Sequence, residues 1–189
     1  MSHRVLNPLF ESEAAELPKS PRQFGLELID FEDASRLNAA WHSRLPVIPD
    51  HCKWICFGAS FMESIYAVAI WSRPVARLLN DKPWLELRRL AIASDAPKFT
   101  ASWMLGKMVR QLAVMRPDIA VLISYQDTAV HKGTIYKAAG WEAVSLSSGG
   151  SWNRTTGSRV RSLTQTKARK VRWQKVIREA LDRAPQEAA

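Results

Sequence analysis

Apolar and polar positions follow two different periods along this chain, and together the periods predict both helices and strands. Apolar residues three and four apart over residues 31–45 are typical of an amphipathic helix, which Pro46 and Pro49 should end. Runs rich in Val, Ile, Phe and Trp over residues 54–60 and 65–72 predict two antiparallel strands around a short turn. The first half of the chain therefore mixes helix with antiparallel sheet.

A strand, a helix and a second strand are predicted next, over residues 84–94, 97–115 and 119–125. Thr100 or Ser102 is expected to cap the helix, and the order predicts a βαβ unit. Period-two alternation in the first strand places three side chains on each face. One face carries Leu85, Leu87 and Arg89, and the opposite face carries Glu86, Arg88 and Leu90.

The last third predicts a short helix over residues 131–139, ended by Gly140 in the left-handed conformation, and a closing strand over residues 141–147. A short helix is expected near residues 170–181. We therefore predict an α/β (α+β) fold, in which helices flank a mixed central sheet. Its expected divisions are an N-terminal lead or strap (1–23), one domain (24–150) and a basic C-terminal extension (151–189).

Charge is concentrated in the expected extension. Residues 1–150 hold seventeen Lys and Arg against fifteen Asp and Glu, whereas residues 151–178 hold nine Lys and Arg and no acid, in a chain of net charge +9. Such a segment favours nucleic acid as partner, although a solvated or packed tail is the alternative. The candidate DNA contacts are Trp152, Arg154, Arg159, Arg161, Lys167, Arg169, Lys170, Arg172 and Trp173.

The two cysteines, Cys52 and Cys56, are too few for a disulfide scaffold or a zinc ribbon. A reducing, cytoplasmic setting is expected. No apolar run approaches the roughly 18 residues of a membrane span, so no membrane contact is expected. The oligomeric state is not indicated.

A candidate anion site lies where the helix follows residues 84–94. The first amides of a helix lack intrahelical partners and can hold a pyrophosphate. The residues concerned are Lys98, Phe99, Thr100, Ala101 and Ser102.

Two stretches, WLELRRLAIASDAPKFTASWMLGKMVRQLA and VLISYQDTAVHKGTIYKAAGW, resemble the central motifs of GNAT-type N-acyltransferases. The resemblance implies a GNAT fold, acetyl-CoA or another acyl-CoA as cofactor along Leu90, Ile92 and residues 98–102, and Tyr136 as general acid. The glycine-rich pyrophosphate loop of that superfamily is absent, and Phe99 stands where the related group has asparagine.

Within that superfamily, ELRRL, APKFTAS, SYQDTAVHKGTIYKAAGW, WHSRLP and KVRW are most similar to the Mom-type DNA-modification proteins of bacteriophages. This likeness implies modification of the N6 amine of adenine in DNA, which protects that DNA from restriction. It also implies possible iron. The substrate-binding candidates are Arg44, Arg89, Ser124, Tyr125 and His131.

The catalytic candidates are Tyr136, Asp127, Glu86 and His42, and each has a structural alternative. Tyr136 can be a packed aromatic, Asp127 a helix cap, and Glu86 a partner of a neighbouring arginine. His42, Asp127 and His131 form a proton relay or a metal site only if the fold brings them together. Two other functions remain open: acetyl transfer to a small-molecule or protein amine, and nucleic-acid binding without catalysis.

Overall fold

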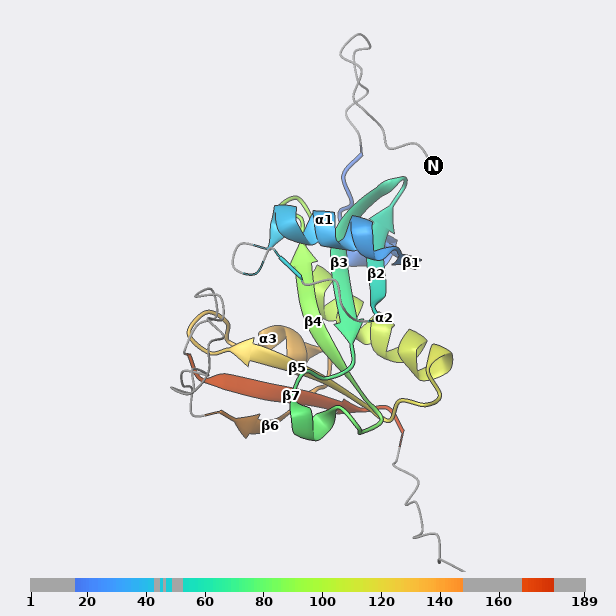
Figure 1. Cartoon of the computed structure of the whole chain (residues 1–189). Coiled ribbons are helices and arrows are strands. Elements are labelled where there is room, and N and C mark those ends of the chain that lie inside the picture. The colour runs from blue at the N-terminus through green and yellow to red at the C-terminus, as the bar shows by residue number, and fades with distance from the viewer. Residues whose placement is uncertain (1–15, 43–44, 46, 49–52, 148–167, 179–189) are drawn as a thin grey trace, which may run out of the picture.

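The computed structural model of the protein describes residues 16–42, 45, 47–48, 53–147 and 168–178 (Figure 1). Its seven strands form one sheet in the order β1-β2-β3-β4-β5-β7-β6. The strands are β1 (Gly25–Ile29), β2 (Ile55–Phe61), β3 (Ser64–Ser72), β4 (Trp84–Ile92), β5 (Val121–Asp127), β6 (Glu142–Leu146) and β7 (Lys170–Val176). The helices are α1 (Phe31–Trp41), α2 (Thr100–Met115) and α3 (Thr134–Ala138), with short 3-10 turns η1 (Pro21–Gln23) and η2 (Arg77–Leu79).

Helices cover both faces of the sheet, as the apolar pattern predicts. On one face α1 packs Ala34 against Cys56 and Ile70. The opposite face carries the larger core, in which α2 and α3 pack against the strands; its fully buried Trp71 donates its indole N–H to the sulfur of Met108 at 3.1 Å. Figure 1 shows α1 in front of β2–β4 and α2 behind them. The predicted mixed α+β sheet is confirmed.

The βαβ unit is confirmed as β4–α2–β5, which holds the parallel pairing of the sheet. This pairing is short: it runs from Trp84 opposite Val121 to Leu87 opposite Ser124. Beyond that point β4 continues beside β3, and β5 continues beside β7. The two strands diverge visibly in Figure 1, so the middle of the sheet opens at Leu87 and Ser124.

A β-bulge in β4 corrects the predicted alternation. Trp71 pairs with Leu87 but the preceding Ile70 pairs with Arg89, so Arg88 is the extra residue. Leu90 consequently packs on the same core as Leu87, and Arg89 turns to the α1 face. Strict period-two alternation fails here because a bulge inserts one unpaired residue and shifts every later side chain to the other face.

The segment from Lys170 is a strand, so the predicted helix is wrong. β7 lies between β5 and β6 and pairs with both. The domain boundary at residue 151 is corrected with it, since part of the expected extension is an interior strand. Strand β1 was not predicted. Of the expected N-terminal lead, residues 1–15 lie outside the described part.

The helix ends match the sequence only in part. α1 stops at Trp41, before the prolines expected to end it. The predicted caps of α2 are wrong: Phe99 is the N-cap residue, at φ +71°, and the Thr100 and Ser102 hydroxyls donate to the Pro97 and Phe99 carbonyls.

Gly140 ends α3 at φ +69°, as predicted. Its N–H donates to the Lys137 carbonyl, and the Trp141 N–H reaches back to the Tyr136 carbonyl at 2.9 Å. These two bonds are those of a Schellman motif, and they fix Tyr136 at the end of the short helix.

Candidate active site

Two hydroxyl groups meet where β4 and β5 separate. The Ser124 and Tyr136 oxygens are 2.9 Å apart. Ser124 lies opposite Leu87 in the last parallel pair, and its hydroxyl donates to the Leu87 carbonyl at 3.4 Å. The Ser124 and Tyr136 hydroxyls thus share one hydrogen bond, in which either oxygen can be the donor. A hydroxyl proton therefore lies at the apex of the opening, the point where β4 and β5 part.

Aromatic rings enclose Tyr136. Trp173 of β7 stacks on its ring, with centroids 5.2 Å apart and planes 14° apart, and Trp141 contacts it at 5.8 Å. Burial raises the pKa of Tyr136, and the Ser124 hydrogen bond offsets only part of this effect. The group is a protonated phenol at neutral pH, which is the state a proton donor needs.

Glu86 and Tyr125 lie on the opposite face of the sheet. One Glu86 oxygen accepts the Val75 N–H at 3.0 Å, and the other is 3.2 Å from the Arg88 guanidinium. Burial raises the pKa of Glu86 against the opposing pull of Arg88. The structure thus gives Glu86 the arginine partner that the sequence left open, and both carboxylate oxygens are engaged.

Tyr125 is 37% exposed, at the end of β5 where the sheet opens. Its pKa is raised by burial first and then by the negative charge of Glu86, while Arg172 opposes the shift. Arg172 lies opposite Tyr125 in the β5–β7 pairing and holds its guanidinium 5.6 Å from the centre of the Trp84 ring. Arg172 is therefore part of the site's wall as well as of the basic segment.

Arg89 holds the segment that follows α1. Its guanidinium nitrogens donate to the carbonyls of Leu45 at 3.1 Å, Val47 at 3.3 Å and Arg88 at 2.7 Å. Burial and the adjacent Arg88 lower the pKa of Arg89 to about 10. The bulge turns Arg89 towards α1 and gives it these backbone partners, and its contact with a substrate stays a prediction.

His42 is brought near His131, as the relay hypothesis requires. The pKa of His42 is lowered by burial first, then by Arg89 and by His131. Its Nδ1 accepts the Leu45 N–H at 3.2 Å. The imidazole is therefore neutral, and Nε2 carries its proton.

Asp127 does not cap a helix. Its carboxylate accepts the Ala129 N–H at 2.9 Å, its carbonyl accepts the His131 N–H at 3.0 Å, and α3 has Gly133 as N-cap. No three His, Cys, Asp or Glu gather as metal ligands within the described ranges. The donor set of these described residues does not fit iron.

One side of the opening is formed by the edge of β4 and the start of α2. Leu90 and Ile92 follow the bulge, on the stretch of β4 that lies past its last pair with β5. Lys98 and Phe99 are exposed beside the first turn of α2, Phe99 to 78%. Like any helix start, this turn presents amides without intrahelical acceptors, here those of Ala101 and Ser102.

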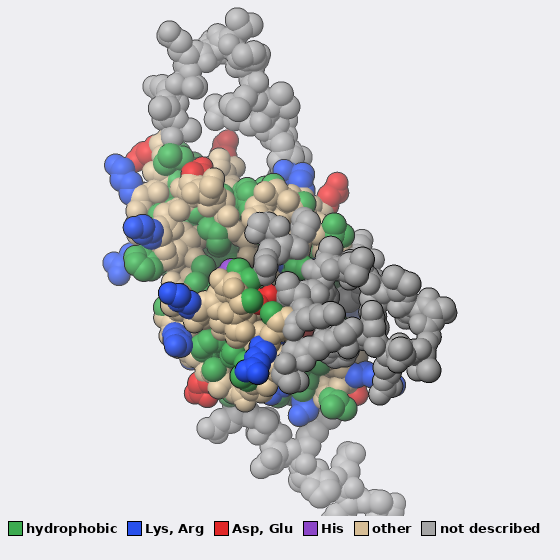
Figure 2. All heavy atoms as spheres, turned by 90° about the vertical axis from the view of Figure 1, so that its left-hand side faces the viewer, with side chains coloured by type: hydrophobic (Ala, Val, Ile, Leu, Met, Phe, Trp, Pro, Cys, Tyr) green, Lys and Arg blue, Asp and Glu red, His purple; other side chains and the backbone are tan. Residues whose placement is uncertain are grey.

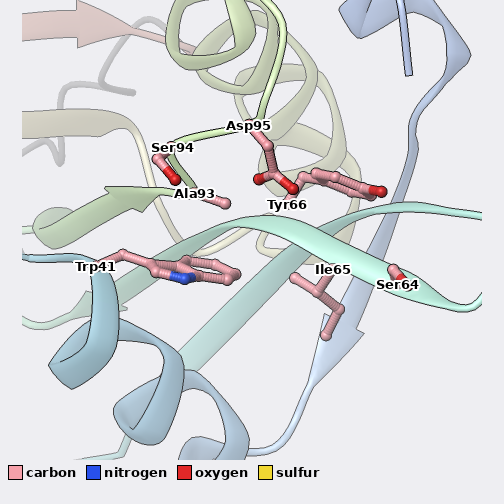
Figure 3. Close-up of a pocket in the computed structure, with 7 residues that line it drawn as sticks. All are labelled: Trp41, Ser64, Ile65, Tyr66, Ala93, Ser94 and Asp95. Atoms are coloured by element: carbon pink, nitrogen blue, oxygen red, sulfur yellow. The ribbon is translucent and has the colours of Figure 1, made fainter. Parts of the chain in front are cut away.

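A separate cavity of about 420 Å³ opens at the far end of β4. Figure 3 shows Trp41 of α1 on one side of it, with Tyr66 of β3 and Asp95 of the β4–α2 loop on the other. Ala93 lies six positions after Leu87, one of them the bulged Arg88, and a strand rises about 3.3 Å per residue, so the cavity lies up to roughly 20 Å along the strand from the Ser124–Tyr136 pair. It is not where those hydroxyls act.

The predicted DNA contacts divide into three groups. Trp173 is 4% exposed, so the expectation that it stacks on bases is wrong and its packing alternative holds. Arg169, Lys170 and Arg172 lie in or just before the first half of β7, where the Thr128 N–H donates to the Arg169 carbonyl at 3.1 Å, at the mouth of the opening. Trp152, Arg154, Arg159, Arg161 and Lys167, like the substrate candidate Arg44, lie outside the described residues.

Figure 2 views the face to which β5 runs, and shows a histidine and acidic side chains at its centre, with lysine and arginine side chains on both halves around them. Gln126, Trp141 and Trp173 belong to the site but were not predicted as site residues. Period-two alternation in β5 marks Gln126 as a partner of the Ser124 face, whereas no local signal relates Trp173 to Tyr136. Within the described residues, no helix is long and apolar enough to cross a membrane.

The arrangement, two parallel strands that part above a buried tyrosine, is the fold of the GNAT-type acyl-CoA N-acyltransferases. The ribosomal-protein-S18-alanine N-acetyltransferase of Escherichia coli matches with a TM-score of 0.55 at 14% identity, over 85% of this chain and 98% of that one. A Bacillus subtilis acetyltransferase solved with CoA matches at 0.58 and 9%, over 81% and 98%. An aminoglycoside acetyltransferase solved with coenzyme A and kanamycin matches at 0.54 and 13%, over 81% and 94%.

Within that fold the chain belongs to the Mom protein family, whose sequence model matches residues 23–187. The match includes β7, which the strand pairing places inside the sheet. No curated protein sequence matches the chain.

Proposed function

We propose that this protein is an acyl-CoA-dependent transferase that modifies the exocyclic N6 amine of adenine in DNA. The observation that carries the proposal is the Ser124–Tyr136 hydroxyl pair at the point where β4 and β5 part, in a chain of the Mom protein family. The fold alone supports acyl transfer, whereas the family supports DNA as the acceptor.

The acyl donor would enter between the diverging strands. Its pantetheine arm would follow β4 past Leu90 and Ile92, and its pyrophosphate would meet the Ala101 and Ser102 amides, with Lys98 adding a positive charge. Neighbouring structures of the same fold hold CoA or acetyl-CoA. This placement would bring the thioester to Ser124 and Tyr136.

The acceptor would approach from the α1 face. Adenine N6 is stacked inside duplex DNA, so the base must be flipped or single-stranded before it can react. The exposed ring of Tyr125 offers a stacking surface there. The Arg169 and Lys170 side chains, beside the same mouth, would meet flanking phosphates.

The transfer forms an N–C bond and breaks the C–S bond of the thioester. N6 attacks the carbonyl carbon, and its surplus proton leaves through Asp127 at the end of β5. The departing thiolate takes the phenolic proton of Tyr136, because the buried phenol stays protonated until this transfer. Neutral His42, near His131, can relay protons between this mouth and water.

Nucleoside mass spectrometry tests the proposal. DNA from cells that express the protein should contain an N6-modified adenine, and the Tyr136→Phe variant should reduce it by roughly 10²-fold, the usual weight of general acid catalysis. Such DNA should also resist restriction endonucleases whose sites contain the modified base, in the cytoplasm of a bacterial or phage-infected cell.

Two results would contradict it in different ways. An unchanged adenine profile, with acetyl groups transferred to small-molecule or protein amines, would retain the enzyme and change the acceptor. No heat of binding with acetyl-CoA in calorimetry, together with retained DNA binding, would leave a nucleic-acid-binding protein without catalysis.

A further inference from the structure

Trp173 faces the candidate acid from a strand that is remote in sequence. It lies directly opposite Ser124 in the β5–β7 pairing, and its indole stacks on the Tyr136 ring at 5.2 Å between centroids. One side chain thus contacts the phenol that is hydrogen-bonded to Ser124. Trp141 covers another side of the same ring, at 5.8 Å and an angle of 59°.

Gln126 fixes the orientation of that indole. The Trp173 Nε1–H donates to the Gln126 Oε1 at 2.7 Å, and the Gln126 Nε2 donates to the His131 carbonyl. Gln126 is 6% exposed, so both halves of its amide are used inside the protein. A buried amide with both ends bonded has one orientation, and the indole inherits it.

Gly133 allows the loop before α3 to close over this pair. A Cβ at Gly133 would lie 2.5 Å from Gln126 Oε1 and 2.5 Å from Trp173 Cζ2. Backbone at φ +72° therefore packs directly on the indole and the amide. The loop that begins α3 and the strand that carries Trp173 are held together at the tyrosine.

We propose that Trp173, oriented by Gln126, is a positioning residue that directs the Tyr136 hydroxyl to the apex of the opening. The proposal rests on the proposed role of Tyr136 as acid. A tyrosine side chain has two rotatable bonds that set the direction of its ring. The stacking of Trp173 on one face of the Tyr136 ring and the contact of Trp141 on another side restrict both bonds. Positioning matters because a displacement of about 1 Å at a reacting group costs on the order of 10²-fold in rate.

The proposal assigns the KVRW stretch a role in catalysis, where charge had suggested contact with nucleic acid. It also gives the Trp173 wall an effect on protonation, since burial is the first cause that raises the pKa of Tyr136. A smaller side chain in place of Trp173 admits water to Tyr136 and lowers its pKa, so less of the phenol is protonated at alkaline pH.

The first experiment compares Trp173→Phe and Gln126→Leu with the wild-type protein in acyl transfer. We expect kcat to fall by about 10- to 100-fold, with the KM for acetyl-CoA almost unchanged and the alkaline limb of the kcat profile moved to lower pH. Trp54→Phe is the matched control. Trp54 stacks on Phe31 at the start of α1, so this variant should leave kcat unchanged. An unchanged kcat in Trp173→Phe would overturn the proposal.

A double-mutant cycle separates positioning from general damage. If Trp173 acts through Tyr136, then Trp173→Phe should have no further effect on kcat in a Tyr136→Phe background. An equal loss in both backgrounds would mean that Trp173 acts independently of Tyr136, and would refute the proposal.

A readout without turnover distinguishes this proposal from the proposed function. The chain has three tyrosines, so Tyr66→Phe with Tyr125→Phe leaves Tyr136 as the single phenol for an alkaline absorbance titration. Trp173→Phe should move that titration to lower pH. An unmoved titration would overturn positioning by Trp173 even if the enzyme is active; a moved titration in a protein that transfers no acyl group would retain the contact and reject the function.

Discussion

Replacing Gly133 by alanine tests the packing at the candidate site. Gly133 and Gly140 have almost the same backbone, with φ of +72° and +69°. They differ in what an added Cβ would meet. At Gly133 it would lie 2.5 Å from both Gln126 Oε1 and Trp173 Cζ2, whereas at Gly140 the nearest atom is the flexible end of Lys175 at 3.4 Å.

The expected destabilisation follows from these distances. Alanine in left-handed backbone costs roughly 1–2 kcal/mol at either position. At Gly133 the clash with two buried groups adds overpacking of about 1–3 kcal/mol. We therefore expect Gly140→Ala to lower the free energy of unfolding by about 1–2 kcal/mol, and Gly133→Ala by roughly 2–5 kcal/mol.

Urea unfolding followed by tryptophan fluorescence measures both variants against wild type. The backbone cost is common to the two, so their difference isolates the contact with Gln126 and Trp173. Equal destabilisation would refute the close packing of Gly133 on the indole. A larger loss at Gly140 would contradict the assignment of both environments.

Three further predictions concern other described residues. In a Cys52→Ser variant the remaining thiol, Cys56, should resist thiol reagents at pH 8 until the protein unfolds, because burial raises its pKa to about 12. Arg89→Met should lower the free energy of unfolding in urea by about 1–3 kcal/mol, since the part-buried carbonyls of Leu45 and Arg88 lose their donor. The pKa of His42 is lowered in the folded protein, so His42 contributes stability above its unfolded pKa of about 6.5, and this stability is lost as the pH falls through the folded pKa. His42→Gln should therefore flatten the decline of the unfolding midpoint between about pH 7 and 5.

Much of the fold could be predicted from local pattern. The strands around residues 55–72, the β4–α2–β5 unit and the end of α3 at Gly140 each have a nearby signal: a period, a turn or a glycine stop. The likeness to GNAT and Mom proteins rests on the same stretches, and Tyr136 was predicted within them. These features depend on residues close together in the chain, where propensity and capping act.

The site's surroundings could not be predicted in this way. KVRW fits a helix or a strand by period, and its pairing with β5 and β6 decided between them. The bulge at Arg88, which turns Arg89 away from the predicted face, depends on pairing with β3. Of the two partners of Glu86, Arg88 follows from the local alternation, whereas Val75 comes from the fold.

The sequence by itself predicted Tyr136 as a site residue, the strand it lies beside and the helix that carries it. Tertiary structure alone decided what surrounds Tyr136: the hydrogen bond with Ser124, the Trp173 ring stacked on it, and Gln126 bonded to that indole. The physical reason is that burial and stacking join residues nearly fifty positions apart, as in the Gln126–Trp173 bond, and no local period records such contacts.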